Sequence, residues 1–388
     1  MTTHVFIVDS TTFKYHLEFL FAGTGAKEDF IDFNDSQNTI LGGGTENKLT
    51  SMIADASRIR EGDLILFYLQ QNYSENIYEG KFYGVFKATQ NWSFLDNNDD
   101  KQFLKDKLKK SLTFRTLIKP HKVYSEGVTE WEALDEIKNI VSPNQMLWSL
   151  IYRKLKGNRG NTMITIYESE RICQLIRNKN SQTTLDCKNK FVSYDFETQK
   201  IIIKDKIVNS YDGRSEEINI LPRLIQKFKD KKAFEAHLQA YIVKNIGLNK
   251  NQSLDKLIIS DGSIEWIGNE VSVGVGMQRI DIMLSLIQNE QKICMPIELK
   301  AVEATIQNAI QIQRYIDWIE QYYIPNRQSD IQPILLTKKT ENKATSEYKK
   351  VISSFNAFNK RNTKRCNKLK YIEFELDDNK LLFNEITY

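Results

Sequence analysis

The sequence predicts a multidomain protein of mixed α+β and α/β class. Its 388 residues exceed the size of an ordinary single domain and indicate two or three. Short apolar runs typical of strands alternate with longer segments of helical periodicity along the whole chain. No long Gly/Ser-rich or Pro-rich tract marks a linker, so the domain boundaries must come from changes in pattern.

The composition says more about the cellular compartment of the protein than about its activity. The 54 Lys and Arg against 50 Asp and Glu give a net charge of +4, which neither indicates nor excludes a nucleic-acid partner. Cys173, Cys187, Cys294 and Cys366 form no C-x-x-C pair, which favours a reduced compartment and argues against a zinc site. No signal peptide and no apolar run of roughly 18 residues is found. We therefore expect a cytoplasmic protein with no membrane partner.

The N-terminal part reads as a small β structure with helices. Residues 4–9 (H-V-F-I-V-D) predict a strand, and a glycine-containing loop then leads to a helix around residues 46–56. A turn at Glu61-Gly62-Asp63 precedes the strands L-I-L-F-Y-L and G-K-F-Y-G-V-F-K-A-T. Over residues 1–120 this order resembles the PUA-like modules of the EVE and YTH kind, which are small barrels that hold a nucleobase.

The resemblance implies a pocket that takes a base flipped out of a duplex, because such a base must be stacked and bonded along its edge. Trp92, which follows a strand among polar neighbours, is the best single candidate. The alternative is that the strand aromatics belong to the core. The candidate set is Tyr68, Phe82, Tyr83, Trp92 and Phe94, with polar help from Asn47 or Ser51.

A basic segment at residues 146–162 follows this module. It combines a helical apolar face with cations that lead into a glycine-containing loop, a combination that can contact phosphates or guanine edges; a solvated basic face is the alternative. With this extension, the predicted DNA-recognition domain covers residues 1–175. The DNA-contact candidates of the segment are Arg153, Lys154, Lys156, Arg159 and Asn161.

Residues 176–228 predict a connection between two larger bodies. The polar stretches 178–190 and 205–217 flank two strand-like runs, F-V-S-Y-D and K-I-I-I-K. We expect these runs to form a small hairpin. The second large domain then covers residues 229–388.

The most informative part of the chain is a predicted hairpin at residues 278–301. Asp281 lies in its first apolar run, and Glu298 and Lys300 lie in the second, two positions apart and therefore on one face of a strand. Burying such charges costs several kcal/mol per ion unless they are paired or bind a metal. A buried ion pair is the structural interpretation of these residues, and a metal site is the functional one.

Two helical patterns flank this hairpin. Residues 232–247 carry Glu235 at the start of a helix, and residues 303–323 carry Gln311 and Tyr315 in Q-x-x-R-Y-x-x-W. Together with R-I-D-I and I-E-L-K, these segments resemble the PD-(D/E)xK catalytic domain of NucS-type mismatch endonucleases and their restriction-enzyme relatives. The resemblance spans residues 230–340 and implies a mixed-sheet nuclease fold.

Carried over by position, the resemblance makes Asp281, Glu298 and Glu235 the acidic metal set and Lys300 the catalytic lysine. Gln311 is the polar residue of the following helix, and Tyr315 is a weaker member. Oxygen ligands of this kind suit Mg²⁺, which binds through one or two carboxylates plus waters and substrate phosphate. Glu270, just before the Asp281 strand, is a competing acid whose alternative role is a solvated turn carboxylate.

The sequence therefore leads to the hypothesis of a Mg²⁺-dependent, site-specific endonuclease of restriction type that hydrolyses double-stranded DNA and senses a modified or flipped base. Cutting both strands needs two active sites, so we expect a homodimer. Whether a companion methyltransferase exists stays open. The alternatives are a mismatch or branched-DNA endonuclease and a non-catalytic reader of modified nucleic acid; the intact Asp281, Glu298 and Lys300 argue against the reader.

Overall fold

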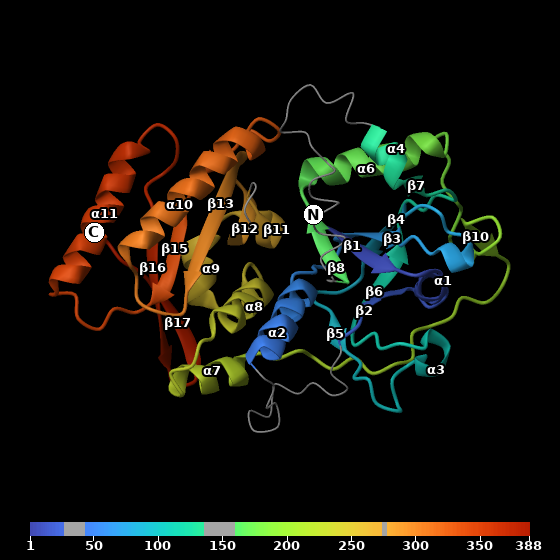
Figure 1. The fold of residues 1–388 in the computed structure, drawn as a ribbon, viewed down its shortest axis with the longest axis horizontal. Coiled ribbons are helices and arrows are strands. Elements are labelled where there is room, and N and C mark those ends of the chain that lie inside the picture. The colour runs from blue at the N-terminus through green and yellow to red at the C-terminus, as the bar shows by residue number, and fades with distance from the viewer. Residues whose placement is uncertain (27–42, 136–159, 274–277) are drawn as a thin grey trace. The chain divides into compact units, whose positions relative to one another are not determined.

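The computed structural model describes residues 1–26, 43–135, 160–273 and 278–388, which divide into two compact units (Figure 1). Unit 1 comprises Met1–Asp32 and Asp55–Ile218, and unit 2 comprises Phe33–Ala54 and Asn219–Tyr388. The prediction of a mixed α/β multidomain chain is confirmed. The division differs from the expected boundaries, because the second unit begins at Asn219 and also takes residues from the N-terminal part.

Unit 1 is built on a curled sheet in the order β2-β6-β4-β3-β1-β8, with β5 paired to β6 and β7 to β4. Strands β1 and β3 are parallel and the other pairs are antiparallel. The strands are β1 (Thr3–Val8), β2 (Phe21–Thr24), β3 (Leu64–Leu69), β4 (Lys81–Ala88), β5 (Phe94–Leu95), β6 (Phe114–Pro120), β7 (Val128–Thr129) and β8 (Asn161–Ile164). The helices are α1 (Ser10–Glu18), α3 (Lys105–Leu108), α4 (Glu130–Asp135) and α6 (Ile166–Lys179).

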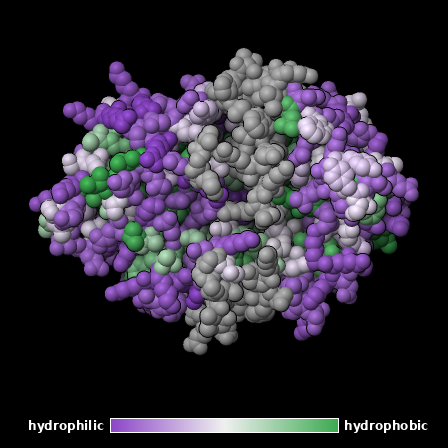
Figure 2. Space-filling view, viewed as in Figure 1, coloured by the Kyte–Doolittle hydropathy of each residue, from purple (hydrophilic) through white to green (hydrophobic). Residues whose placement is uncertain are grey.

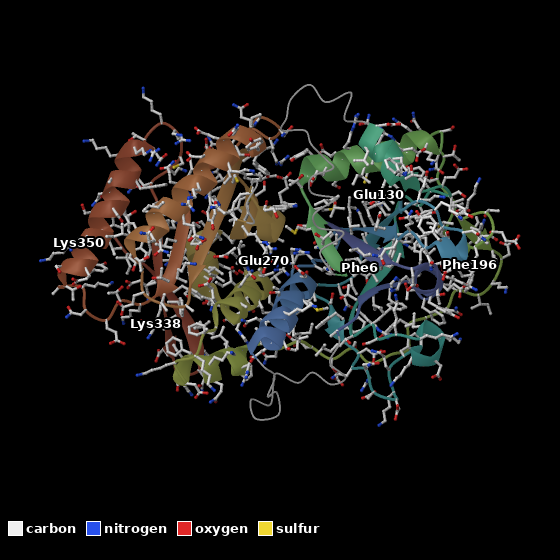
Figure 3. All side chains as sticks on the ribbon, in the orientation of Figure 1. Phe6, Glu130, Phe196, Glu270, Lys338 and Lys350 are labelled. Carbon is white, nitrogen blue, oxygen red and sulfur yellow. The ribbon has the colours of Figure 1, made fainter. Side chains whose placement is uncertain are left out.

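The hairpin of β9 (Phe191–Asp195) and β10 (Lys200–Lys204) belongs to unit 1. Tyr194 of this hairpin contacts Phe13 of α1, with ring centroids 5.0 Å apart, and is 2% exposed. Phe6 of β1 lies in the same core, whereas Phe196 at the hairpin turn is 48% exposed (Figure 3). The hairpin that we expected to connect two bodies is instead part of one core, because its apolar side chains find their burial there.

Unit 2 is a mixed sheet in the order β11-β12-β13-β15-β16-β17, with β14 paired to β13. Its central pairs β13–β15 and β15–β16 are parallel, and the outer pairs are antiparallel. The strands are β11 (Ser263–Ser272), β12 (Arg279–Gln288), β13 (Gln291–Lys300), β14 (Asp330–Ile331), β15 (Ile334–Lys338), β16 (Lys370–Asp377) and β17 (Lys380–Glu385). The helices are α7 (Leu221–Lys229), α8 (Glu235–Asn245), α9 (Gln252–Ile258), α10 (Ile306–Trp318), a π-helical turn (Ile319–Tyr323) and α11 (Ser346–Arg361). Helix α2 (Gly43–Ser57) contributes its residues up to Ala54 to this unit.

Helices cover both faces of the unit 2 sheet (Figure 1). On β16, Phe374 contacts Phe228 of α7 and Phe234 just before α8, whereas Tyr371 contacts Phe355 of α11. Successive side chains of a strand alternate between faces, so α7 and α8 lie on one side and α11 on the other. Strand β13 is accordingly buried from Cys294 to Leu299, which explains its nearly continuous apolar run.

Outside the residues drawn in grey, hydrophilic residues dominate the face shown in Figure 2, and apolar ones form only small patches. No helix in the described ranges is long and apolar enough to cross a membrane.

Candidate active site

Asp281 lies where the β12–β13 hairpin opens. The two strands are paired from the turn to Ile282 and Ile297, and Asp281 is the next residue of β12. Its Oδ2 accepts a hydrogen bond from the backbone N–H of Leu299 at 2.8 Å. Beyond this point β13 pairs on its other edge with β15, as far as Lys300 and Thr337. The side chain of Asp281 thus satisfies an amide of β13 at the point where the β12 ladder ends.

Glu298 and Lys300 lie next to Asp281 and meet each other. Lys300 Nζ is 2.6 Å from Glu298 Oε1 and 3.5 Å from Glu235 Oε1, and it also donates to the carbonyl of Leu299 at 2.9 Å. Glu298 is fully buried, while Glu235, the first residue of α8, is half-exposed. The structure therefore brings together one helix and two neighbouring strands at this end of the sheet.

Helix α10 completes the surroundings of Glu298. Tyr315 Oη lies 2.6 Å from Glu298 Oε2 and 2.8 Å from the carbonyl of Arg279, and it accepts a hydrogen bond from Gln311 Nε2 at 2.7 Å. A phenol has one proton to donate. Tyr315 donates it to Glu298, because a charged carboxylate is a stronger acceptor than the carbonyl of Arg279. Gln311 acts on Glu298 through Tyr315, so Tyr315, which we expected to be the weaker member, makes the direct contact.

The electrostatics of the site are unbalanced toward negative charge. Burial and repulsion from Glu298 raise the pKa of Asp281 well above its ordinary value, despite the hydrogen bond from Leu299. Burial likewise raises the pKa of Glu298, against the opposing effect of Lys300. Burial alone would lower the pKa of Lys300, but the carboxylates of Glu298, Glu235 and Asp281 outweigh it and raise that pKa. Lys300 therefore stays charged, and its one ammonium group lies beside three acidic side chains.

The donor set can be compared with the needs of Mg²⁺. Across the described part of the chain, no three His, Cys, Asp or Glu side chains form a group ready to hold a metal ion. The expected three-carboxylate set is therefore not assembled as such, because Glu235 points to Lys300. Asp281 and Glu298 remain as a pair of oxygen ligands. A bound divalent cation would lower their raised pKa values. Mg²⁺ needs only one or two carboxylates, so the pair fits it.

Glu270, the competing acid, is held elsewhere. Its Oε2 pairs with Arg279 Nη1 at 2.5 Å, and its Oε1 lies 3.5 Å from Ser51 Oγ. Glu270 lies within strand β11 and not in the expected turn, although its φ of 48° falls in the left-handed backbone region. The ion pair favours a structural role for Glu270 over a place among the metal ligands.

Sequence reasoning missed a buried ionic network in unit 2 that is centred on Glu46 of α2. This carboxylate is 2% exposed and pairs with Arg223 of α7 at 2.8 Å, with Lys227 at 3.4 Å and with His237 Nε2 of α8 at 2.7 Å. Although burial opposes it, bonding to Arg223 and His237 lowers the pKa of Glu46 to about 2. The network fixes α2 against α7 and against the helix that begins with Glu235.

The predicted aromatic pocket of unit 1 is mostly core. Tyr83 is fully buried, and its hydroxyl donates to the carbonyl of Gln199 at 2.8 Å. Tyr68 is 6% exposed and bonds through its hydroxyl to Glu130, which Figure 3 labels. Phe82 and Phe94 are buried as well. These rings cannot stack on a base, because both faces of the sheet are covered: Tyr83 lies in one core cluster, and Tyr68 and Phe82 lie in another.

The remaining candidates are dispersed. Trp92 is half-buried, with φ of 62°. Asn47 and Ser51 lie on the part of α2 that belongs to unit 2, whereas the aromatic candidates belong to unit 1. Asn161 is buried in β8 and donates to the carbonyl of Asp55 at 3.3 Å. The basic candidates Arg153, Lys154, Lys156 and Arg159 lie outside the described residues.

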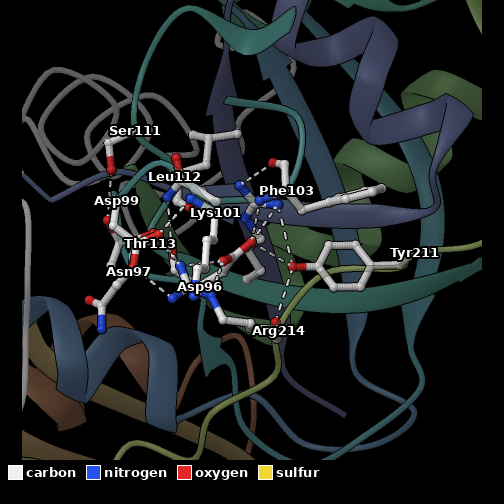
Figure 4. Close-up of polar contacts among 12 residues, drawn as sticks. Asp96, Asn97, Asp99, Lys101, Phe103, Ser111, Leu112, Thr113, Tyr211 and Arg214 are labelled. Atoms are coloured by element: carbon white, nitrogen blue, oxygen red, sulfur yellow. Dashed lines mark hydrogen bonds and ion pairs between the residues drawn. The ribbon is translucent and has the colours of Figure 1, made fainter. Parts of the chain in front are cut away.

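A second buried ion network holds unit 1 together (Figure 4). The fully buried Arg115 pairs with Asp96 at 3.1 Å and donates to the carbonyls of Leu112 and Phe103. Arg214 reaches the same Asp96 at 3.1 Å. Every group of this network is committed to another, so its role is structural.

Comparisons with known proteins add little. No family model and no curated protein matches the chain. Among solved structures, it is similar to human THYN1 in a complex with DNA that contains 5-methylcytosine, with 8% identity and a TM-score of 0.26 over 45% of this chain and 97% of that one. A similarity this weak establishes neither a shared fold nor a shared ligand.

Proposed function

We propose that unit 2 is a Mg²⁺-dependent endonuclease that hydrolyses phosphodiester bonds of double-stranded DNA. The observation that carries the proposal is the convergence of Asp281, Glu298 and Lys300 where the β12–β13 hairpin opens. A structural ion pair would need one acid for one lysine, whereas this site sets the fully buried Glu298 and the partly buried Asp281 beside a single ammonium. Such an excess of negative charge favours a cationic ligand.

The chain's own residues divide the work. Asp281 and Glu298 hold the cation, and a bound Mg²⁺ would supply Lewis-acid polarisation of a phosphoryl oxygen. Lys300, whose raised pKa keeps it protonated, orients the attacking water and stabilises negative charge developing on the phosphate. Tyr315 keeps Glu298 in place by its hydrogen bond. This assignment gives Lys300 a role as a cation and not as the base.

The substrate class and the mode of cutting follow from the sequence resemblance. We propose a restriction-type enzyme, with two copies acting together to cut both strands. Unit 1 would select the site, although of the aromatic residues proposed to hold a base, only Trp92 keeps an exposed part. Mismatch or branched-DNA cleavage is the second candidate, and it rests on the same site residues.

The test is digestion of methylated and unmethylated genomic DNA with Mg²⁺ and with EDTA. We expect Mg²⁺-dependent cutting that Asp281→Asn and Lys300→Met each reduce by about 10²–10³-fold. The matched control is Glu303→Gln, which changes an exposed carboxylate of the same unit. Perfect, mismatched and branched duplexes separate the two candidate activities. Cutting that persists in both site variants, or in EDTA, would refute the assignment.

A further inference from the structure

Unit 1 contains a groove that neither the ion network nor the predicted aromatic pocket uses. It lies between the end of β6 and the loop of residues 184–190, and its volume is about 810 Å³. Leu185 N–H donates to the carbonyl of Val123 at 2.8 Å, which fixes the loop as one wall. The volume falls within the range of about 300–1,000 Å³ that ligand sites occupy.

The floor of the groove is apolar. Leu20, Val123, Leu185 and Val208 line it, and Val123 is 2% exposed. Pro120 lies at the end of β6 beside them. A planar or apolar group that covers this floor removes apolar surface from water, which favours its binding.

The rim is cationic and incompletely neutralised. Lys119, Lys188 and Lys190 line it, and Asp186 is the one carboxylate among the lining residues. Asp186 pairs with Lys190 at 3.4 Å. Within the described ranges, no ion pair is formed by Lys119 or Lys188.

A like-charge pair lies at the same edge. Lys87 of β4 and Lys119 of β6 are direct partners in the antiparallel register. Their side chains therefore share one face of the sheet, and like charges directly opposite each other destabilise a sheet. An anion bound between them would remove that cost.

His121 adds a neutral polar group to this rim. Burial and the charges of Lys87 and Lys122 lower its pKa below the ordinary value. At neutral pH the imidazole therefore offers one donor and one acceptor beside the lysines. A base edge or a sugar hydroxyl is the kind of group that uses both.

We propose that this groove binds a single-stranded segment of nucleic acid, with a base over the apolar floor and its phosphates on Lys119 and Lys188. Charge favours a polyanion, and the apolar floor favours one that carries unstacked bases. The site lies in unit 1 and goes beyond the cutting proposed for unit 2. It needs no metal.

The experiment measures binding of a labelled single-stranded DNA 15-mer by fluorescence anisotropy, with the full chain in EDTA over a series of salt concentrations. The test variant is Lys119→Glu with Lys188→Glu. The matched control is Lys101→Glu with Lys109→Glu, which makes the same charge change at exposed positions of unit 1 away from the groove. Circular dichroism checks that both variants fold.

The groove variant is expected to lose about tenfold or more in affinity. Its slope of log K against log salt should fall by about 1.4, because each phosphate contact on a single strand contributes about 0.7. The control should keep both values. Equal affinity and slope in the two variants would overturn the proposal, as would displacement of the 15-mer by a free mononucleotide or by polyglutamate at the same concentration. Since EDTA removes cleavage from the readout, failure here is distinct from failure of the nuclease assignment.

Discussion

His237→Gln is expected to flatten the pH dependence of unit 2 stability. His237 is fully buried in the Glu46 network. Its Nε2 must carry the proton that it shares with Glu46, and Nδ1 has no hydrogen-bond partner. A second proton would have to sit on this buried, unpartnered nitrogen. Burial therefore outweighs the attraction of Glu46, and with Lys227 and Arg223 nearby it lowers the pKa of His237 to about 4.

The sign of the effect follows from this lowered pKa. Below its ordinary pKa of 6.5, the unfolded chain binds a proton that the folded chain refuses, so stability is present above pH 6.5 and is lost as the pH falls toward about 4. Within this interval, each unit by which the pH falls lowers the free energy of unfolding by at most about 1.4 kcal/mol. The total loss between pH 7 and pH 5 is on the order of 2 kcal/mol. Glu46 adds to the loss only below its ordinary pKa of 4.5.

Urea unfolding at pH 7 and pH 5, followed by tryptophan fluorescence, measures this difference, and the buried Trp266 of β11 contributes the signal of the unit 2 core. Gln can still donate to Glu46, so the variant should fold. We expect the wild type to lose about 2 kcal/mol more than the variant between the two pH values. The control His121→Gln changes an exposed histidine of unit 1 and should leave the pH dependence of unit 2 as it is in the wild type. Parallel profiles for the wild type and His237→Gln would refute the reasoning.

Three further predictions concern the candidate active site of unit 2 and the buried Arg115–Asp96 network of unit 1. Asp281→Asn should raise the Tm in EDTA, because a carboxylate with a raised pKa destabilises the fold once it ionises; Mg²⁺ should raise the Tm of the wild type alone, and an equal rise in the variant in scanning fluorimetry would count against the metal site. Tyr315→Phe removes the bond to Glu298, so urea unfolding should show a loss of about 1.5–3 kcal/mol, and an unchanged midpoint would exclude that contact. Asp96→Asn leaves the buried Arg115 without its full counter-charge and should cost unit 1 about 3–5 kcal/mol in thermal unfolding, whereas Asp100→Asn, on an exposed side chain, should cost little; equal losses would contradict this account.

The sequence predicted local structure well where one pattern decides it. The two apolar runs around Asp281 and Glu298 predicted a hairpin, and β12 and β13 are joined by the two residues Asn289 and Glu290. Both residues have positive φ, as a tight hairpin turn of this kind requires. The predicted helix with Glu235 near its start and the helix of Gln311 and Tyr315 are present as α8 and α10.

Features that depend on contacts between distant parts of the chain were not predicted from the sequence. Glu46 and His237 are separated by 191 residues, and no local periodicity records their contact. The aromatic residues Tyr68 and Tyr83 were proposed for a base pocket, but they lie in separate core clusters, and both are buried because both faces of the sheet are covered. The groove beside Lys119 also went unnoticed, because its walls come from separate segments of the chain.

The path of the chain limits how this protein can be dissected. The backbone passes from one unit to the other three times, once on each side of residues 33–54 and again at Asn219. A fragment that starts at Asn219 would lack Glu46 and would leave Arg223 and His237 without their shared partner. It would also lose the buried side chains of Leu49 and Ile53. Expressing unit 2 as a separate folded fragment therefore requires including residues 33–54.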